Sequence, residues 1–300
     1  MSDSQASRAQ AASRRARFRS NTLPALVTVG PVTLWLVAFI AVPLIYVLVM
    51  SFCSVDQYYN IVYSFTLDSY KAMLDPEYLL LYGQSLLIAL TATLICLGIG
   101  YPFSFFISRT FKSKKTLLYV MVIIPFWTNS LVRIYGLRAF LGASGALNSA
   151  LMAIGVIHEP IGFLYNQGAT IFGMAYQMFP YMVLPLYAAL EHLDQSQLDA
   201  SHDLGATPWQ TLWRVVVPQT TSGIYSGCIM VFIPSLGSFF IADILGGGNA
   251  DVVGNLIQRQ FVSANDWPLG AALSILLIFI TLALVKLYQR AGGDLESLGA

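Results

Sequence analysis

The chain has 300 residues, of which 56% are hydrophobic and 10% are charged. Soluble domains carry about 25% charged residues, so this composition excludes an ordinary soluble domain and predicts a membrane protein. The net charge of +1 says little about partners. The three cysteines form no C-x-x-C pair, which argues against a disulfide framework and against a zinc site.

Residues 1–25 are rich in Ser, Ala and Arg, with Asp3 as the single acid. This composition is also typical of an organelle transit peptide. We favour a disordered basic cytoplasmic tail, because the apolar run that follows is too long for the core of a cleaved signal peptide.

Residues 26–290 are predicted to form one transmembrane domain, followed by a short cytoplasmic tail at 291–300. A helix needs about 20 apolar residues to cross a bilayer. The stretches that meet this requirement are 26–51, 84–108, 117–139, 169–190, 220–245 and 268–288. We therefore expect an all-α polytopic protein with six transmembrane helices.

The Lys and Arg residues predict the orientation, because cytoplasmic loops carry an excess of them. With the N-terminus inside, twelve lie on the cytoplasmic side and four on the other. Both termini are therefore predicted to be cytoplasmic. The external segment 140–168 is expected to contain a short interfacial helix, and the tyrosines of 52–83 are best explained as a membrane-boundary belt.

The cytoplasmic loop 191–219 interrupts two apolar stretches. Asp194 and Gln197 have the spacing of a capping box, which predicts a helix from Gln195 to Leu204. Gly205 supplies the left-handed residue that ends such a helix.

A second helix is predicted from Thr207, Pro208 and Gln210, which repeat the helix-start pattern. Its apolar residues recur at helical spacing and should form one stripe: Trp209, Leu212, Trp213 and Val216. Pro218 is expected to close it before the fifth span.

Three functions could explain this helix pair. A DNA-binding pair would need basic residues on its second helix, and only Arg214 is present there. A helix lying on lipid explains the two Trp residues but not the acidic first helix. A docking element for a soluble partner explains both halves, and we favour it.

The sequence Asp199-Ala200-Ser201, three residues, Gly205, nine residues, Val215-x-Val217-Pro218 resembles the E-A-A-x₃-G-x₉-I-x-L-P loop of bacterial ABC importer permeases. Asp replaces Glu, Ser replaces the second Ala, and Val replaces Ile and Leu. In that family the loop forms a coupling helix that docks on the ATP-hydrolysing subunit. The resemblance assigns this coupling role to Leu198, Asp199, Ala200, Ser201, Leu204, Gly205, Ala206 and Pro218.

Four further stretches resemble the first permease subunit of spermidine/putrescine importers: "IPFWTNSLVRIYG" (124–136), "GALNSAL" (145–151), "DILGG" (243–247) and "DWPLGAALSI" (266–275). The resemblance implies a type I importer permease in the bacterial inner membrane. Its implied partners are a second permease, forming a heterodimer, a dimeric ATPase and a substrate-binding protein. ATP and magnesium would bind at the ATPase, and no cofactor on this chain.

Recognisable catalytic motifs are missing from the sequence. There is no G-x-x-x-x-G-K-[ST] phosphate loop, no H-E-x-x-H and no G-x-S-x-G, so a non-catalytic subunit is expected. The cluster His192, Asp194, Asp199, His202 and Asp203 matches no known ligand spacing, and no metal site is predicted.

Asp243 lies near the outer end of the fifth predicted span. Ionisable residues at bilayer depth usually face a bundle interior or an aqueous path, and a polyamine needs carboxylates and aromatic faces. The candidate path residues are Asp243, Trp127, Tyr135, Tyr176, Phe239 and Phe240. The alternative, a hydrated interfacial residue that caps a helix end, stays open.

Arg133 would repel a cationic cargo unless it pairs with an acid such as Asp243 or extends to the interface. The external side nevertheless carries eight acids against four bases, which leans towards a cation. Alternatives are an importer permease for another small solute, a gradient-driven transporter, which would need an inverted repeat, and a membrane enzyme.

Overall fold

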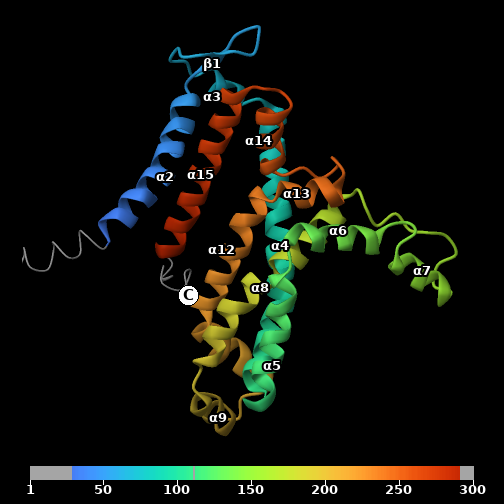
Figure 1. Ribbon diagram of the computed structural model, residues 1–300. Helices are drawn as coiled ribbons and strands as arrows, with labels where there is room; N and C mark the ends of the chain where they lie inside the picture. Colours follow the sequence, from blue (N-terminus) through green and yellow to red (C-terminus); the bar gives the residue numbers. More distant parts are fainter. Residues whose placement is uncertain (1–28, 111, 291–300) are drawn as a thin grey trace, which may run out of the picture.

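The structure is a computed structural model that describes residues 29–110 and 112–290. The predicted tails, residues 1–25 and 291–300, lie outside the described residues. The longest helices form an elongated bundle (Figure 1). They are α2 (Gly30–Met50), α4 (Pro76–Arg109), α8 (Gln167–Glu191), α12 (Thr221–Gly237) and α15 (Trp267–Arg290).

The helices α4, α8 and α12 pack against one another in the centre, and α15 packs against α2 beside them. Close packing of α12 on α8 requires a residue without a side chain. A Cβ atom on Gly223 would lie 2.7 Å from the carbonyl oxygen of Pro185 and 2.6 Å from the Cβ of Ala189. Small residues allow such close approach between membrane helices.

Local sequence explains both ends of α4. The side chain of Asp75 accepts a hydrogen bond from the amide of Glu77 at 3.2 Å, and Pro76 occupies the first helical position. Arg109 lies in the last turn, where the helix dipole favours a cation. The helix begins eight residues before the predicted span 84–108.

Among the described residues, three helices are long and apolar enough to cross a membrane: α2, α4 and α15. Counting each sharply bent helix pair as one span raises the number to five. The helix α8 has 25 residues and covers the predicted span 169–190, but it is not one of these helices. It buries much of its surface against α4 and α12.

The predicted span 117–139 is sharply bent and is not one straight helix. The helix α5 (Lys112–Ile123) continues into a 3₁₀ turn, η1 (Ile124–Trp127), and the chain then bends by 97° into α6 (Ser130–Leu141). Asn129 explains the break, because its side chain accepts from the amide of Leu131 at 2.8 Å and so caps a new helix.

The predicted span 220–245 is also interrupted. The helix α12 ends at Gly237, and the short α13 (Phe239–Ile241) and a π-helical turn, η3 (Ala242–Gly246), follow. Ser238 is not helical, and its hydroxyl donates to the carbonyl of Pro234 at 2.7 Å. The break places Asp243 in the π-helical turn.

Short elements lie at the upper end of the bundle in Figure 1 and on an arm at its side. The strands β1 (Ser54–Val55) and β2 (Ile61–Val62) form an antiparallel hairpin that α3 (Asp68–Ala72) follows. The arm carries α6 and α7 (Ala146–Ala153), and α7 confirms the short helix expected within 140–168. The helix α14 (Val253–Val262) precedes α15.

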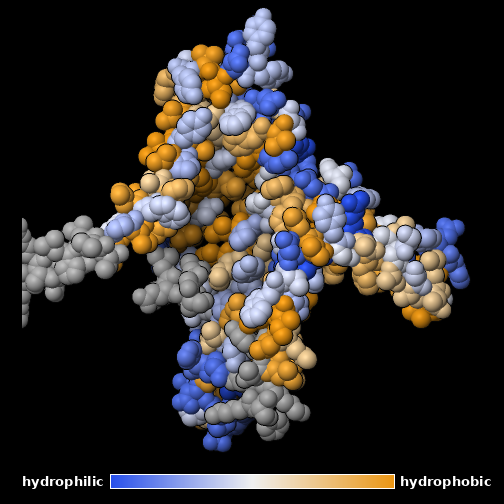
Figure 2. Space-filling view, viewed as in Figure 1, coloured by the Kyte–Doolittle hydropathy of each residue, from blue (hydrophilic) through white to orange (hydrophobic). Residues whose placement is uncertain are grey.

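The opposite end of the bundle carries α9 (Gln195–Asp203). After it come α10 (Pro208–Thr211), a π-helical turn η2 (Leu212–Val216) and α11 (Val217–Gln219). Figure 2 shows hydrophilic residues gathered at this end.

Candidate functional site: the α9 loop and the η3 segment

The helix α9 begins and ends where the sequence predicts. Asp194 is its N-cap, and the side chain accepts from the amide of Ser196 at 3.0 Å. This hydrogen bond lowers the pKa of the Asp194 carboxyl. Within the described residues Gln197 adds no side-chain bond and Asp194 accepts from the second helical residue, so the N-cap is formed but the predicted box with Gln197 is not. Gly205 has φ +78°, the left-handed conformation expected of it.

The start of α10 is confirmed in full. The amide of Gln210 donates to the hydroxyl of Thr207 at 3.3 Å, and the amide of Thr207 donates to the side-chain oxygen of Gln210 at 2.9 Å. Pro208 occupies the first helical position. These reciprocal bonds form a complete capping box.

The apolar stripe predicted for the second helix is only partly buried. Val216 is buried, whereas Trp209 is 67% exposed and Trp213 is 54% exposed. The two Trp rings lie edge to face at 5.7 Å, and Trp209, Leu212 and Val216 line one groove. Pro218 does not close the helix, because it lies within α11 and the chain bends by 70° only at Thr220.

The residues assigned to ATPase coupling are divided between two sides of α9. Leu204 is 89% exposed at the end of the helix. The other exposed members are Asp199, Ala200, Gly205 and Pro218, and Ala206 is half-buried. Leu198 and Ser201 are buried on the inner side.

The inner side of α9 is anchored to the bundle. Leu198 packs in a buried cluster with Leu190, Leu193 and Val216. The hydroxyl of Ser201 lies 2.9 Å from that of Thr211 and joins α9 to α10. The outward residues are therefore presented by a supported helix.

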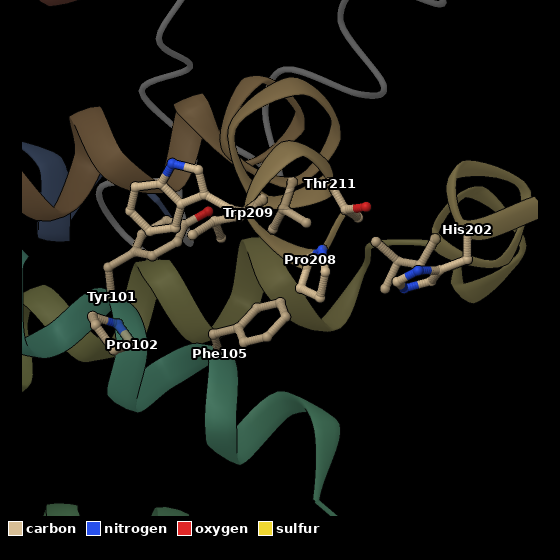
Figure 3. A pocket seen from close by; sticks show the side chains of 10 residues that line it. Tyr101, Pro102, Phe105, His202, Pro208, Trp209 and Thr211 are labelled. Atoms are coloured by element: carbon tan, nitrogen blue, oxygen red, sulfur yellow. The ribbon is translucent and has the colours of Figure 1, made fainter. Parts of the chain in front are cut away.

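A groove of about 520 Å³ separates α9 and α10 from the end of α4 (Figure 3). Tyr101, Pro102 and Phe105 line it from α4, and Pro208, Trp209 and His202 approach from the other side in Figure 3. The remaining lining residues are Leu198, Thr211, Leu212 and Val216.

A polar chain also joins α4 to α9. Arg109 Nη1 donates to Gln195 Oε1 at 2.6 Å, and Gln195 Nε2 donates to Asp199 Oδ1 at 3.1 Å. The Arg109 Nε and Nη2 atoms are buried and have no hydrogen-bond partner among the described residues. These bonds connect the end of α4 to the first turn of α9.

The second region surrounds Asp243 in η3. Its carboxylate is exposed and accepts from Nδ2 of Asn255 in α14 at 2.5 Å. Asn255 is only 1% exposed, also donates to the carbonyl of Phe239 at 3.1 Å, and accepts from the amide of Val252 at 3.0 Å. Asn255 thus fixes one side of the segment that carries the acid.

The predicted aromatic path residues form separate pairs. Phe239 and Phe240 lie edge to face at 6.3 Å, and Tyr176 contacts Phe126 at 6.4 Å between ring centroids. Trp127 is 85% exposed and Tyr135 is 54% exposed. Within the described chain, no hydrogen bond or ring contact joins Asp243 to these rings.

Arg133 contacts Phe126 and not Asp243. Its guanidinium carbon lies 4.3 Å from the centroid of Phe126, and no ion pair joins it to Asp243 among the described residues. The Nε and Nη1 atoms are buried without a hydrogen-bond partner there. The contact is a cation–π interaction.

Phe126 also lines an apolar cavity of about 470 Å³ between α4, α5 and α8. Other rings in its wall come from Phe172, Tyr176 and Phe179. Only Tyr176 had been predicted as a path residue.

Residues 100–291 match the family described as binding-protein-dependent transport system inner membrane component. The spermidine/putrescine transport system permease protein PotB of Escherichia coli K12 is 42% identical over 257 residues, covering 86% of this chain and 94% of the relative. The chain belongs to this family. The protein of that name from Haemophilus influenzae is 41% identical over 265 residues, covering 88% of this chain and 93% of its own length.

Solved structures show the same fold. A chain of a bacterial alginate ABC transporter, in complex with alginate pentasaccharide-bound periplasmic protein, matches with a TM-score of 0.73 at 18% identity. The match covers 91% of this chain and 94% of that one. A chain of the MetNI methionine ABC transporter gives a TM-score of 0.52 at 16% identity, covering 73% and 97%.

Sequence reasoning missed Asn255, Phe126 and Tyr165. Asn255 and Phe126 act through partners 12 residues or less away in sequence but across a helix break, which an uninterrupted span does not predict. Pro125 and Asn129 were the residues in the sequence that indicated a helix break. Tyr165 offered no such indication, because its partners lie far away in sequence, in η3, in α6 and in the loop after η3.

Proposed function

We propose that this chain is a permease subunit of an ATP-driven polyamine importer in the bacterial inner membrane. The observation that carries the proposal is the similarity to PotB relatives, which spans nearly nine-tenths of both chains. The cargo for which those relatives are named, spermidine and putrescine, gives the cargo class. A permease for another small solute is the nearest alternative.

The proposed topology has six membrane-spanning helices and both termini in the cytoplasm. It places the α9 end in the cytoplasm and the β1–β2 hairpin outside. The excess of Lys and Arg on the α9 side supports this orientation. The helix α8 serves as a span that contacts neighbouring helices more than lipid, which explains its lower hydropathy.

The α9 loop would couple this chain to an ATPase dimer. Leu204 and Gly205 form an exposed, capped tip on a helix that is anchored by Leu198 and Ser201. An anchored helix can transmit a displacement to the bundle, whereas a flexible loop would absorb it. ATP and magnesium would bind to the ATPase, so this chain itself would catalyse no reaction.

A second permease subunit would complete the translocation path, and a substrate-binding protein would deliver cargo from outside. Asp243 is the acid on this chain best placed to meet a cation, because it is exposed and lies at a helix break. Among the described residues Arg133 forms no ion pair with Asp243, because its guanidinium lies against the face of Phe126, so the Asp243 charge is not neutralised by it.

Uptake of labelled putrescine and spermidine into proteoliposomes tests the proposal. The vesicles would contain this chain with the second permease and ATPase encoded beside it, and the binding protein would be added outside. Uptake that requires both ATP and the binding protein is the expected result. ATPase activity without movement of either polyamine would reject the cargo, and failure of any ATPase to co-purify would reject the docking role of α9.

A further inference from the structure

Tyr165 lies where three separate elements meet. It precedes α8, and its backbone is bound by η3 and by the segment that follows η3. Its amide donates to the carbonyl of Leu245 at 2.7 Å, and its carbonyl accepts from Nδ2 of Asn249 at 3.0 Å. Leu245 belongs to the π-helical turn that carries Asp243.

The side chain of Tyr165 makes a third connection, to α6. Arg138 Nη2 donates to the phenol oxygen at 3.0 Å, and the guanidinium carbon lies 5.9 Å from the ring centroid. One residue therefore holds α6, the start of α8 and the η3 turn together.

The ring of Tyr165 also packs closely against the backbone of Gly247. Gly247 has φ +58°, and a Cβ atom there would lie only 2.4 Å from Tyr165 Cδ1. Glycine is thus required both by the left-handed backbone and by the ring.

Tyr165 itself has φ +62°. A positive φ is uncommon for a bulky non-glycine residue and is retained only where the surroundings hold it in place. The two backbone bonds and the Arg138 contact are interactions that can hold it. Its ring remains 48% exposed, so packing alone does not explain the conformation.

We propose that Tyr165 is a positioning residue that fixes the η3 turn and so places Asp243 for contact with the cationic cargo. Asp243 is then held from two sides. Asn255 binds its carboxylate from α14, and Tyr165, just before α8 and bonded to Arg138 of α6, binds Leu245 of its turn. This role rests on the proposed function, because it assumes a cation that meets Asp243.

The role predicts a specific pattern in the reconstituted complex. Tyr165→Phe removes only the phenol bond and should lower uptake about threefold, as expected for one hydrogen bond. Tyr165→Ala also removes the ring and should lower it about tenfold. ATP hydrolysis stimulated by the binding protein should stay within about twofold of the unmodified rate, so uptake per ATP falls. A variant that merely folds less well would lower both activities together.

The decisive measurement is the combination of Tyr165→Ala with Asp243→Asn. If Tyr165 acts through Asp243, the double variant should be no worse than the more impaired single variant, because contacting or coupled residues are non-additive. Hydrogen exchange of residues 242–250 should also increase in Tyr165→Ala. Tyr58→Phe is the matched control, since Tyr58 is 81% exposed on the external hairpin, and it should change neither quantity.

Additive losses, or unchanged exchange in residues 242–250, would overturn the positioning role. A normal uptake rate in Asp243→Asn alone would overturn it as well, since there would be no cargo ligand to place. Failure of the unmodified complex to move any polyamine is a different result, because it rejects the proposed cargo before Tyr165 is tested.

Discussion

The α9 loop and the η3 segment lie in different parts of the bundle and are built in opposite ways. In the α9 loop most of the determining contacts join residues within about four positions of each other, as in the Asp194 cap and the Thr207–Gln210 box. In the η3 segment they join residues that are far apart, such as Tyr165 and Leu245.

The two kinds of construction suit two different requirements on an importer permease. A docking tip for a soluble motor must keep its shape while its surroundings move, and locally closed hydrogen bonds provide that. A cargo path must change shape between outward- and inward-open states, and contacts between separate elements can be made and broken as those elements move. The following variants test whether the two regions follow these rules.

The largest effect is expected at Gly205. A β-branched residue at φ +78° is strained by about 1–2 kcal/mol, so Gly205→Val should distort the tip and lower uptake at least about tenfold. Gly205→Asn is the matched variant, because Asn tolerates the left-handed conformation. The proteoliposome assay with ATP hydrolysis measured in parallel compares them.

Apart from the adjacent residues, no atom in the described part of the chain lies within 4 Å of a Cβ placed on Gly205. The two variants therefore distinguish an effect on the backbone from an effect on the partner's docking surface. Recovery in Gly205→Asn would assign the loss to the backbone conformation. Equal loss in both variants would mean that the docking surface excludes any side chain there. Full uptake in Gly205→Val would contradict the coupling role of the tip.

The second effect concerns Asp243. Asp243→Asn removes the charge but keeps a side-chain oxygen that can accept from Asn255, so the helix break should stay intact. We expect polyamine uptake to fall about tenfold at equal expression. Asp56→Asn on the β1–β2 hairpin is the control, and it should leave uptake unchanged. Equal rates for both variants would favour the alternative of a hydrated interfacial residue.

The sequence predicted the α9 loop well because its determinants are adjacent along the chain. The helix Gln195–Asp203, its Gly205 end and the Thr207 cap all appear where expected. Spacing alone did not predict how far the apolar stripe is buried, because Val216 packs in the cluster with Leu190 and Leu198 while Trp209 and Trp213 remain exposed.

Spans were predicted less well where the chain breaks. Hydrophobicity alone cannot distinguish one continuous apolar helix from two at an angle, and the segment 117–139 contains both the apolar run and the Asn129 cap. The positions of several predicted path residues, Asp243 among them, depend on these helix breaks. Asp243 was found because an acid in an apolar stretch is conspicuous, whereas its partner Asn255 lies beyond the break in an amphipathic helix.

A third, smaller effect should come from the link between α4 and α9. Gln195→Ala breaks the bonds to both Arg109 and Asp199, each with a net value of about 1 kcal/mol. We expect uptake per ATP to fall about two- to fivefold. Arg109→Lys keeps the positive charge but not the planar donor group, and should give a similar loss.

A double variant that combines Arg109→Lys with Gln195→Ala sharpens this test. If Arg109 and Gln195 act as one link, the losses should not add. Additive losses would mean that Arg109 supports α4 without transmitting movement to α9. Unchanged uptake in Arg109→Lys would assign the role of Arg109 to its charge at the cytoplasmic boundary.

The smallest effect concerns the Asp194 cap and its dependence on pH. The amide of Ser196 lowers the pKa of this carboxyl below its ordinary value of about 3.9. A carboxyl whose pKa is lowered in the folded state contributes stability that is fully present above its unfolded pKa and is lost as the pH falls through its folded pKa.

The thermal midpoint of Asp194→Ala should therefore lie at most about 3 °C below that of the unmodified complex at pH 7, and this difference should narrow only below about pH 4. Asp194→Asn keeps the acceptor without the charge, so its midpoint should lie between the two and lack this pH dependence. A gap that closes near pH 6 instead would assign the titration to another group, such as a histidine, and would show that the cap does not depend on the Asp194 charge.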